Sequence, residues 1–509
     1  MPINNTKNLK SEILNNKLVY ILLSIILLVG FFLRVYRIDQ VLGFYFDQGR
    51  DAMVVWNLIH NGKFFLIGPT TGIAGIFRGP LYYYLIAPFY FLGGGDPIWP
   101  SIFLSFTTIL ANLLMYYLGF KFHSRVAGLL AATVASFSFN ITIASRWLSN
   151  PTPMMLLSML LIFFMYLISN KSQSINKNKY FLGWLWVGLG FIAGVSLFHF
   201  GSSGEFFYLP ALAIFALWQR STLTMKTIIF AGLAFLATAS PLIIFDLRHE
   251  GILRNNLVGF LFGEETFKLT FTEVLKVRTN FYYDVFKNKI FHSVRTYEWW
   301  LLSGITTIFL FNFKEIWKKS GNKILMLTLG SPMIGLLFFQ GNEGNIYDYY
   351  MTGYYLIFIL LFGITLATVW RFYLGKVLVL YFLYIFLNNN VPITWSRIND
   401  GLDGPHTIAF GNQKEALDWV YKDAKGENFN TDVYVPPVIP HAYDYLFAWY
   451  EQDHNGLISD HVDLLYTLYE VDPPHPERLE VWMARQKGIG EVEYEKSFGG
   501  ITVQRRHRI

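Results

Sequence analysis

Cysteine is absent from this chain of 509 residues, and charge is scarce. Without cysteine the protein has no disulfide bond, no thiol nucleophile and no cysteine metal site. Charged residues make up only 15% of the chain and hydrophobic residues 53%. The net charge of +6 lies largely in short loops between apolar runs, so it reports membrane topology rather than nucleic-acid binding.

Long apolar runs dominate what is present. They recur from Leu18 to Leu387 and are close to the ~20 residues that a helix needs to cross a bilayer. A soluble protein of this length would alternate apolar and polar faces, so the pattern predicts a polytopic α-helical membrane protein. The first run lacks a small-residue cleavage site and is interpreted as a retained span. The eleven predicted spans are 18–36, 98–120, 126–144, 153–169, 180–200, 205–218, 227–245, 298–313, 324–340, 350–370 and 374–388.

One further apolar segment, 79–93, decides the predicted topology. As a helix it reaches only ~22 Å, short of the ~30 Å hydrocarbon core, and it contains Pro80 and Pro88. If it does not cross, five short loops on the side of the N-terminus carry 13 Lys and Arg, whereas the three short loops opposite carry only Arg146. Because positive charge stays in the cytoplasm, we expect a cytoplasmic N-terminus and an exoplasmic C-terminus.

The chain changes character at about Pro392. Beyond it, amphipathic helical patterns alternate with strand patterns, and the last two strands form a hairpin that turns at Gly499 and Gly500. We therefore expect a small exoplasmic α/β domain after the membrane domain. The predicted helices are 414–424 and 476–488, and the predicted strands are 432–436, 464–471 and 491–506. The predicted domains are 1–391, with exoplasmic loops at 37–97 and 246–297, and 392–509.

The first exoplasmic loop gathers charge close to the membrane, in the stretch GFYFDQGRDAMVVWNLIHNG. Asp47 stands about ten residues beyond the first span, where a carboxylate can accept a proton from a hydroxyl or amine that attacks a membrane-held electrophile. The alternative is a solvated acid that caps the following helix, with Asp51 in its first turn. Position alone favours the capping role.

Two arginines are candidates for holding a phosphate at the lipid boundary. Arg146 is the sole basic residue in the short exoplasmic loops, and a guanidinium there can bind a phosphate through two parallel hydrogen bonds. The alternative is an interfacial anchor whose charged end reaches water. Arg78, just before the Pro80 turn, has the same two interpretations.

Two further polar segments are predicted on the exoplasmic side. FDLRHEG, at the end of the seventh span, carries more charge than a membrane anchor needs, and substrate contact is one of two open roles for it. FHFGSSGEF places His199 and Glu205 around a Gly/Ser-rich turn. The candidates in FDLRHEG are Asp246, Arg248 and His249. The sequence has no P-loop, dinucleotide-binding glycine pattern or nucleophile elbow.

These motifs, in this order and on one side of the membrane, resemble the glycosyltransferase-C class. The nearest likeness is to the dolichyl-phosphate-mannose protein mannosyltransferases and the bacterial lipid A aminoarabinose transferases, and it covers roughly residues 18–170. The Asp-Glu-x-Arg motif of those families corresponds to DQGR in this chain. Asp47 and Arg50 match it, and Gln48 replaces the second acid.

Two more motifs carry the resemblance. The Pro-Pro-Leu-Tyr-Tyr segment of the family corresponds to RGPLYYY, with Gly79 in place of the first proline. The Ser-Arg turn of the second outer loop corresponds to Ser145 and Arg146. The acid that follows this turn in the relatives is absent, and Asn150 lies nearby.

Enzymes of this class move a sugar from a polyprenyl-phosphate carrier outside the membrane. The resemblance implies that Asp47 is the general base, that one carboxylate serves a single displacement with inversion, and that cations stabilise the leaving phosphate. The aromatic segment 79–93 has two open roles, lining a groove for lipid or sugar and anchoring at the membrane interface. The implied substrate-binding residues are Arg50, Asp51, Arg78, Tyr82, Tyr83, Arg146, Asn150, His199, Asp246, Arg248 and His249.

The implied partners are a polyprenyl-phosphate-linked sugar, a lipid, glycan or protein acceptor, and membrane lipids, but no nucleic acid. No cofactor is required, and Gln48 and Asn150 give no support to a divalent cation. The exoplasmic segments contain no usable Asn-x-Ser/Thr, which favours a bacterial plasma membrane. Two alternatives stay open: a lipid-linked-sugar flippase or transporter, although mid-span ionisable residues are few, and a non-catalytic scaffold for the C-terminal domain.

Overall fold

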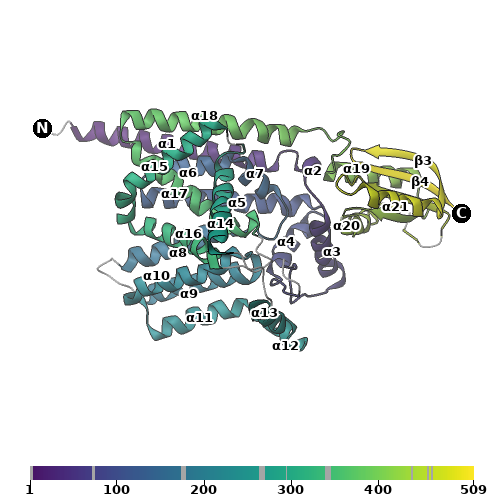
Figure 1. Ribbon diagram of the computed structural model, residues 1–509, viewed down its shortest axis with the longest axis horizontal. Helices are drawn as coiled ribbons and strands as arrows, with labels where there is room; N and C mark the ends of the chain where they lie inside the picture. Colours follow the sequence, from purple (N-terminus) through teal and green to yellow (C-terminus); the bar gives the residue numbers. More distant parts are fainter. Residues whose placement is uncertain are drawn as a thin grey trace.

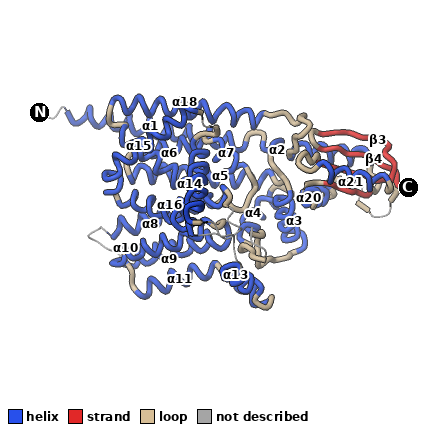
Figure 2. Tube along the Cα trace, viewed as in Figure 1, coloured by secondary structure: helices blue, strands red, loops and turns tan. Residues whose placement is uncertain are grey.

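The protein is a bundle of near-parallel helices with a small domain at one end. The structure, a computed structural model, describes residues 4–71, 75–172, 179–262, 270–293, 295–338, 346–436, 439–454, 458–459 and 462–509. The N-terminus lies at one end of the bundle and the C-terminal domain at the other (Figure 1). We call the end that carries the C-terminal domain the domain-side face. The strands lie in the C-terminal domain (Figure 2).

Long helices build the bundle, and shorter ones gather towards the domain-side face. The bundle helices are α1 (Asn4–Val35), α5 (Ile98–Phe122), α6 (Arg125–Phe137), α8 (Met154–Ser172), α9 (Lys179–Val195), α10 (Tyr208–Trp218), α11 (Met225–Thr238), α15 (Thr296–Lys318), α16 (Ser320–Phe338), α17 (Tyr355–Val369) and α18 (Tyr373–Asn399). The shorter helices are α2 (Ile38–Val41), α3 (Phe46–Asn61), α4 (Leu81–Leu92), α7 (Phe139–Arg146), α12 (Ser240–Arg248), α13 (Ile252–Phe262) and α14 (Phe271–Ile290). Short 3-10 or π segments are η1 (Ser196–Phe200), η2 (Gly204–Phe207), η3 (Arg220–Thr222) and η5 (Asp348–Tyr354).

Eight of the eleven predicted spans coincide with helices that are long and apolar enough to cross a bilayer. Among the described residues, six single helices meet that standard, and two bent pairs, α6 with α7 and α11 with α12, meet it together. The remaining three predicted spans fall on α8, α10 and α15, which pack within the bundle (Figure 1). The multi-span membrane fold is therefore confirmed, and eleven as the number of spans stays a prediction.

The segment predicted not to cross forms the short helix α4 at the domain-side face (Figure 1). It has 12 residues, too few to span the hydrocarbon core. Its start is fixed to η1, because Gly79 N–H donates to Phe198 O over 2.7 Å and Leu81 N–H donates to His199 Nδ1 over 3.3 Å. Its length agrees with the prediction that this segment does not cross.

The large loop predicted at 246–297 is mainly helical. Its residues 263–269 and 294 lie outside the described part of the chain. Helix α14 packs against α16, α17, α7 and η5, and its buried Arg278 donates from Nε to Leu336 O over 3.2 Å. This bond satisfies one of the carbonyls that the end of α16 leaves unpaired. The loop thus closes over the ends of the bundle helices.

Helix α18 runs past the expected domain boundary at 391/392. Pro392 lies inside it, although proline usually ends or kinks a helix. Contacts to other elements stabilise the part of α18 around Pro392. Asn390 Nδ2 donates to Ile290 O over 2.8 Å, and Trp395 stacks on Tyr36 with ring centroids 5.8 Å apart. The first element of the C-terminal domain is α19 (Phe410–Ala424).

The C-terminal domain is the expected α/β unit, and its sheet order is β1-β2-β4-β3. Strands β1 and β2 are parallel, whereas β4 is antiparallel to both of its neighbours. Gly499, at φ 60°, makes the predicted hairpin turn between β3 and β4. The elements are α19, β1 (Asn430–Tyr434), α20 (His441–Tyr450), β2 (Leu464–Glu470), α21 (Pro476–Lys487), β3 (Gly490–Phe498) and β4 (Ile501–Arg508). The sequence had not predicted α20.

The C-terminal domain docks directly on α3 through α20. At the contact, a Cβ atom on Gly49 would overlap the backbone of His441 and Ala442, so only glycine lets the two helices approach this closely. Nearby, Gln413 Nε2 donates to Phe44 O over 2.9 Å, and Trp449 Nε1 donates to Gly94 O over 2.8 Å. The domain therefore supports the helix that carries the predicted catalytic acid.

Candidate active site

Helix α3 presents the charged stretch of the first loop at the domain-side face. It begins at Phe46, where Gln48 Oε1 accepts the Tyr45 N–H over 3.2 Å, and it ends where Gly62 adopts a left-handed φ of 61°. Gln48 Nε2 also donates to Leu148 O over 3.1 Å. The glutamine that replaces the second acid of the family motif thus caps α3 and ties it to the 147–153 turn.

Arg50 links the two carboxylates of α3. Its Nη1 lies 2.9 Å from Asp47 Oδ1 and its Nη2 lies 2.8 Å from Asp51 Oδ1. The side chain of Asp47 is 65% exposed, whereas that of Asp51 is only 8% exposed. Thr70 approaches the same guanidinium, with its Oγ1 3.4 Å from Nη1. Asp47 is therefore the acid that an incoming molecule can reach. Asp51 is the buried acid, and its ion pair with Arg50 fixes the position of the guanidinium.

Asp51 is buried in a polar corner between α3 and α4. It accepts a hydrogen bond from the Tyr83 hydroxyl over 3.2 Å, besides those from Arg50. Burial raises the pKa of Asp51 to about 6, although the Arg50 cation opposes this shift. Burial, followed by the charge of Asp51, also raises the pKa of Tyr83, so this phenol stays a hydrogen-bond donor.

Two buried polar atoms beside this corner have no hydrogen-bond partner within the described ranges. They are the Tyr82 hydroxyl and Asn150 Oδ1, and both side chains are buried. Asn150 is held on its other side, because its Nδ2 donates to Phe200 O over 3.4 Å. An unsatisfied buried polar atom costs about 1–3 kcal/mol, so a ligand group that pairs with either atom would recover free energy.

Arg78 and His199 hold the loop before α4 in place. Arg78 Nη1 donates to the carbonyls of Phe200, over 3.0 Å, and of Gly201, and burial lowers the pKa of Arg78. His199 is buried, accepts the Leu81 N–H at Nδ1, and therefore carries its proton on Nε2, 2.7 Å from Thr238 O. Both residues lie beside the corner as supports for α4.

The glycine that replaces the first proline of the family segment has a packing reason. A Cβ atom on Gly79 would overlap the His199 ring. The loop can therefore pass over His199 only with glycine at this position. The presence of His199 explains why this chain has glycine where the family segment has proline.

Arg146 is used differently from what the resemblance implied. It is buried, and its guanidinium donates to Leu33 O over 2.8 Å and to Tyr36 O over 3.0 Å. These carbonyls stand at the end of α1, where the last turn of a helix leaves its oxygens unpaired. The charged end of Arg146 thus binds the backbone at the end of α1 and does not reach water as the expected interfacial anchor would, and phosphate binding by Arg146 stays a prediction.

The cluster in FDLRHEG does not join the α3 corner. Asp246 Oδ1 accepts the N–H groups of Leu253 and Arg254, over 2.8 and 3.1 Å, and so caps the start of α13. Arg248 and His249 are exposed. Helix α13 contacts the first loop through Asn256 Nδ2, which donates to Gly75 O over 3.0 Å.

Sequence inspection missed one ion pair, between a buried lysine of α14 and a half-exposed aspartate of η5. Lys289 on α14 lies 2.7 Å from Asp348 Oδ2, and the Tyr355 hydroxyl donates to the same oxygen over 2.8 Å. The Lys289 side chain is only 5% exposed, and burial lowers its pKa. The one sequence signal was its place beside apolar residues near the end of an amphipathic helix. In the described part of the chain, no three His, Asp or Glu side chains group as metal ligands.

Comparison with known proteins identifies the fold. Neither a protein-family model nor a curated protein sequence matches this chain. Solved structures do match, and the fold that they share is that of the glycosyltransferase-C class. The fold class expected from the motifs is therefore confirmed.

Two structures of ArnT from Cupriavidus metallidurans match over nearly their whole length. The apo form matches with a TM-score of 0.61 and 10% identity, over 96% of this chain and 97% of ArnT. The form bound to undecaprenyl phosphate matches with a TM-score of 0.55, 10% identity and the same coverage. An oligosaccharyltransferase from Archaeoglobus fulgidus, tethered to an acceptor peptide, matches with a TM-score of 0.49 and 12% identity, over 96% of this chain and 74% of the other.

Proposed function

We propose that the protein is an integral-membrane glycosyltransferase that moves a sugar from a polyprenyl-phosphate donor to an exoplasmic lipid, glycan or protein acceptor, with inversion. The observation that carries this proposal is the exposed Asp47 carboxylate held beside Arg50 on α3. A fold shared with ArnT, which has been solved with undecaprenyl phosphate bound, supports a donor of the same kind.

In this proposal Asp47 is the general base and Arg50 binds the donor phosphate. The acceptor hydroxyl or amine gives its proton to Asp47 while its oxygen or nitrogen attacks the anomeric carbon, and the bond from that carbon to the phosphate oxygen breaks. The charge that grows on the leaving phosphate is stabilised by the Arg50 guanidinium. One accessible carboxylate suits a single displacement, because retention needs a second carboxylate close by as the nucleophile.

The Asp47–Arg50 ion pair implies that the donor binds before Asp47 accepts the proton of the acceptor. While Arg50 is paired with Asp47, its guanidinium engages one oxygen of the carboxylate. A donor phosphate that draws Arg50 away leaves that oxygen free to accept the proton of the acceptor. Asp51, buried on the other side of Arg50, keeps the guanidinium close to both partners. The carboxylate is thus freed for the acceptor once the donor is in place.

The decisive experiment incubates the purified protein with a panel of polyprenyl-phosphate sugars labelled in the sugar, together with a mixture of envelope lipids, glycans and peptides. Transfer predicts that label leaves the polyprenyl phosphate. A flippase, the alternative, predicts that in proteoliposomes the label changes leaflets but stays on its lipid. No release of label from any donor, with protein that is folded by thermal shift, would remove the transferase proposal.

The orientation of the chain is part of the proposal, because the donor sugar is transferred on the outer side. We propose that the domain-side face is exoplasmic in a bacterial plasma membrane and that the N-terminus is cytoplasmic. Ser174, in a loop predicted to be cytoplasmic, lies outside the described residues, so Ser221 in another loop of that side takes its place. Ser221 in η3 and Ser497 on β3 are both exposed, and the chain has no cysteine to interfere. Ser497→Cys should react with an impermeant maleimide in intact cells, and Ser221→Cys only after lysis. Labelling of both from the same side would contradict this topology.

A further inference from the structure

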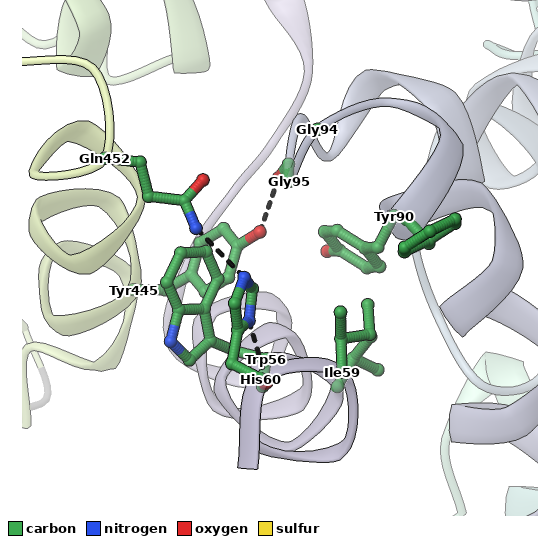
Figure 3. A pocket seen from close by; sticks show the side chains of 10 residues that line it. Trp56, Ile59, His60, Tyr90, Gly94, Gly95, Tyr445 and Gln452 are labelled. Atoms are coloured by element: carbon green, nitrogen blue, oxygen red, sulfur yellow. Dashed lines mark hydrogen bonds between the residues drawn. The ribbon is translucent and has the colours of Figure 1, made fainter. Parts of the chain in front are cut away.

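A cavity of about 360 Å³ lies between the second half of α3, the end of α4 and α20 of the C-terminal domain (Figure 3). This volume is at the small end of the range for ligand sites. Its place at the contact of the membrane domain with the C-terminal domain is also typical of ligand sites. The lining residues are Val55, Trp56, Ile59, His60, Tyr90, Phe91, Gly94, Gly95, Tyr445 and Gln452.

Three aromatic rings make the walls of this cavity. Trp56 and Tyr445 stand at 89° to each other, and Tyr90 and Tyr445 at 72°, with ring centroids 5.8 Å apart in both pairs. Rings at right angles offer faces on more than one side of the space between them. The face of an aromatic ring carries partial negative charge, so it attracts the weakly positive C–H groups of a saturated ring.

Polar groups stand at both ends of the cavity. At its inner end, the buried Tyr90 hydroxyl points into the space (Figure 3) and has no hydrogen-bond partner among the described residues. At the mouth, the exposed Gln452 donates from Nε2 to His60 Nε2 over 2.9 Å, and His60 donates from Nδ1 to Trp56 O over 3.1 Å. Aromatic walls with hydrogen-bonding groups at both ends fit a sugar ring, which has apolar faces and a polar rim.

The cavity and the candidate active site are built on the same two helices, α3 and α4. Val55 is one helical turn, ~6 Å along the axis, beyond Asp51 on the same face of α3. Burial, followed by Tyr445, Tyr82 and Asp51, raises the pKa of Tyr90, so its hydroxyl stays protonated and lies within electrostatic reach of that corner. Tyr82 and Tyr90, whose hydroxyls have no partner among the described residues, both interact electrostatically with Asp51.

We infer that this cavity binds a sugar ring of the acceptor, so that the glycan is held by the C-terminal domain while its reacting hydroxyl reaches Asp47. The inference rests on the proposed function and narrows its acceptor to one that contains carbohydrate. A lipid tail is disfavoured, because polar groups, the Tyr90 hydroxyl and the His60–Gln452 pair, stand at both ends of the cavity. The place of α3, α4 and α20 at the domain-side face can be followed in Figure 1.

The test measures sugar binding to the purified full chain in lipid nanodiscs by saturation-transfer NMR. The probes are methyl α-D-mannopyranoside, methyl β-D-glucopyranoside and methyl 2-acetamido-2-deoxy-β-D-glucopyranoside. At least one probe should receive saturation. Its apparent Kd should rise about tenfold in Trp56→Ala, which removes a wall, and about three- to tenfold in Tyr90→Phe, which removes the inner hydroxyl. Gln452→Trp, which fills the mouth from an exposed position, should weaken binding without removing any buried contact.

Phe64→Ala is the matched control, because Phe64 is an aromatic residue just beyond α3, 82% exposed and not part of the lining. Its Kd should equal that of the unmodified protein. Absence of saturation for all three sugars, or an unchanged Kd in both Trp56→Ala and Gln452→Trp, would overturn the inference.

Asp47→Asn separates the inference from the proposed function. It should bind the sugar with unchanged Kd while losing transfer. A loss of binding in Asp47→Asn as large as that in Trp56→Ala would place the sugar at the carboxylates and overturn the inference. Sugar binding without consumption of any labelled donor would remove the transferase proposal and leave the cavity assignment standing.

Discussion

Helix α3 and the α12–α13 turn both carry a dense charge cluster near the domain-side face, and their contacts differ. On α3, Asp47 is largely exposed beside Arg50, and the buried Tyr82 hydroxyl on the neighbouring helix has no partner in the described part of the chain. At the α12–α13 turn, Asp246 is committed to the amides of α13, and Arg248 faces water. The comparison teaches that density of charge does not mark a site. An accessible acid beside a held cation and unsatisfied buried groups is the more informative sign.

The largest expected effect is a difference in donor turnover between a variant of Asp47 on α3 and a variant of Asp246 at the α12–α13 turn. Asp47→Asn should lower donor turnover about 10²–10⁴-fold, because the general base is removed while the carboxamide keeps the size of the side chain. Asp246→Asn should change turnover less than about threefold, since its acid only caps a helix. Radiolabel release at matched expression measures both. Similar losses in the two variants would erase the distinction between the clusters.

The next effect concerns the buried acid under Arg50. The pKa of Asp51 in the folded protein is about 6, above the ordinary 3.8, so the folded state binds the proton more tightly than the unfolded state. The stability that this group contributes is therefore fully present below pH 3.8 and is lost as the pH rises through about 6, by about 3 kcal/mol in total.

Thermal shift of the unmodified protein and of Asp51→Asn between pH 4 and 7.5 checks this pH dependence. The asparagine does not titrate, so the stability of the unmodified protein relative to the variant should fall as the pH rises. A difference that does not depend on pH would show that Asp51 stays ionised throughout, held by Arg50.

Arg146 allows a further comparison with Arg50. Its hydrogen bonds to the described residues go to backbone carbonyls, whereas Arg50 pairs with carboxylates. Arg146→Ala should destabilise the protein by about 2–3 kcal/mol, since the carbonyls of Leu33 and Tyr36 lose a charged donor. Transfer per folded molecule should fall less than about threefold. Thermal shift and turnover measured on the same preparation separate the two effects. A loss of turnover far beyond the loss of folded protein, with partial recovery in Arg146→Lys, would restore the phosphate role.

The smallest effect falls on the α12–α13 turn itself. Asp246→Ala removes the side-chain acceptor of two amides at the start of α13 and should cost about 1 kcal/mol, confined to that helix. Hydrogen exchange of the α13 amides should rise while that of α3 stays unchanged. Faster exchange in α3 would mean that the two clusters are coupled, through Asn256 and the first loop.

Local signals in the sequence were enough for much of the fold. The apolar runs gave the membrane helices, and paired glycines at 499 and 500 gave the hairpin, because both depend on neighbours in the chain. The end of the last predicted span, before Pro392, differs from the end of α18 at Asn399 for the opposite reason. This helix is stabilised by Ile290 and Tyr36, which lie far away in sequence.

The sequence was enough to name candidate residues of the site, but not to predict which partners each side chain contacts. The motif DQGR located Asp47 and Arg50, since a short helical spacing brings them to one face. What Arg146 and Lys289 do depends on partners 113 and 59 residues away in the chain, which no local pattern shows. The cavity beside α20 could not be predicted from the sequence either. It depends on a contact between distant parts of the chain, and α20 itself was not expected.

The close contact between Gly49 and the backbone of α20 has a consequence for how the protein is made. Gly49 leaves the ribosome about 390 residues before Ala442. At the usual ~5–20 residues per second, the helix that bears the two acids waits roughly 20–80 s for the helix that covers it. During that interval every later membrane segment is inserted. Assembly of the site is therefore a late event in biogenesis, and a chain that stops short of its last domain leaves α3 bare on the side that α20 would fill.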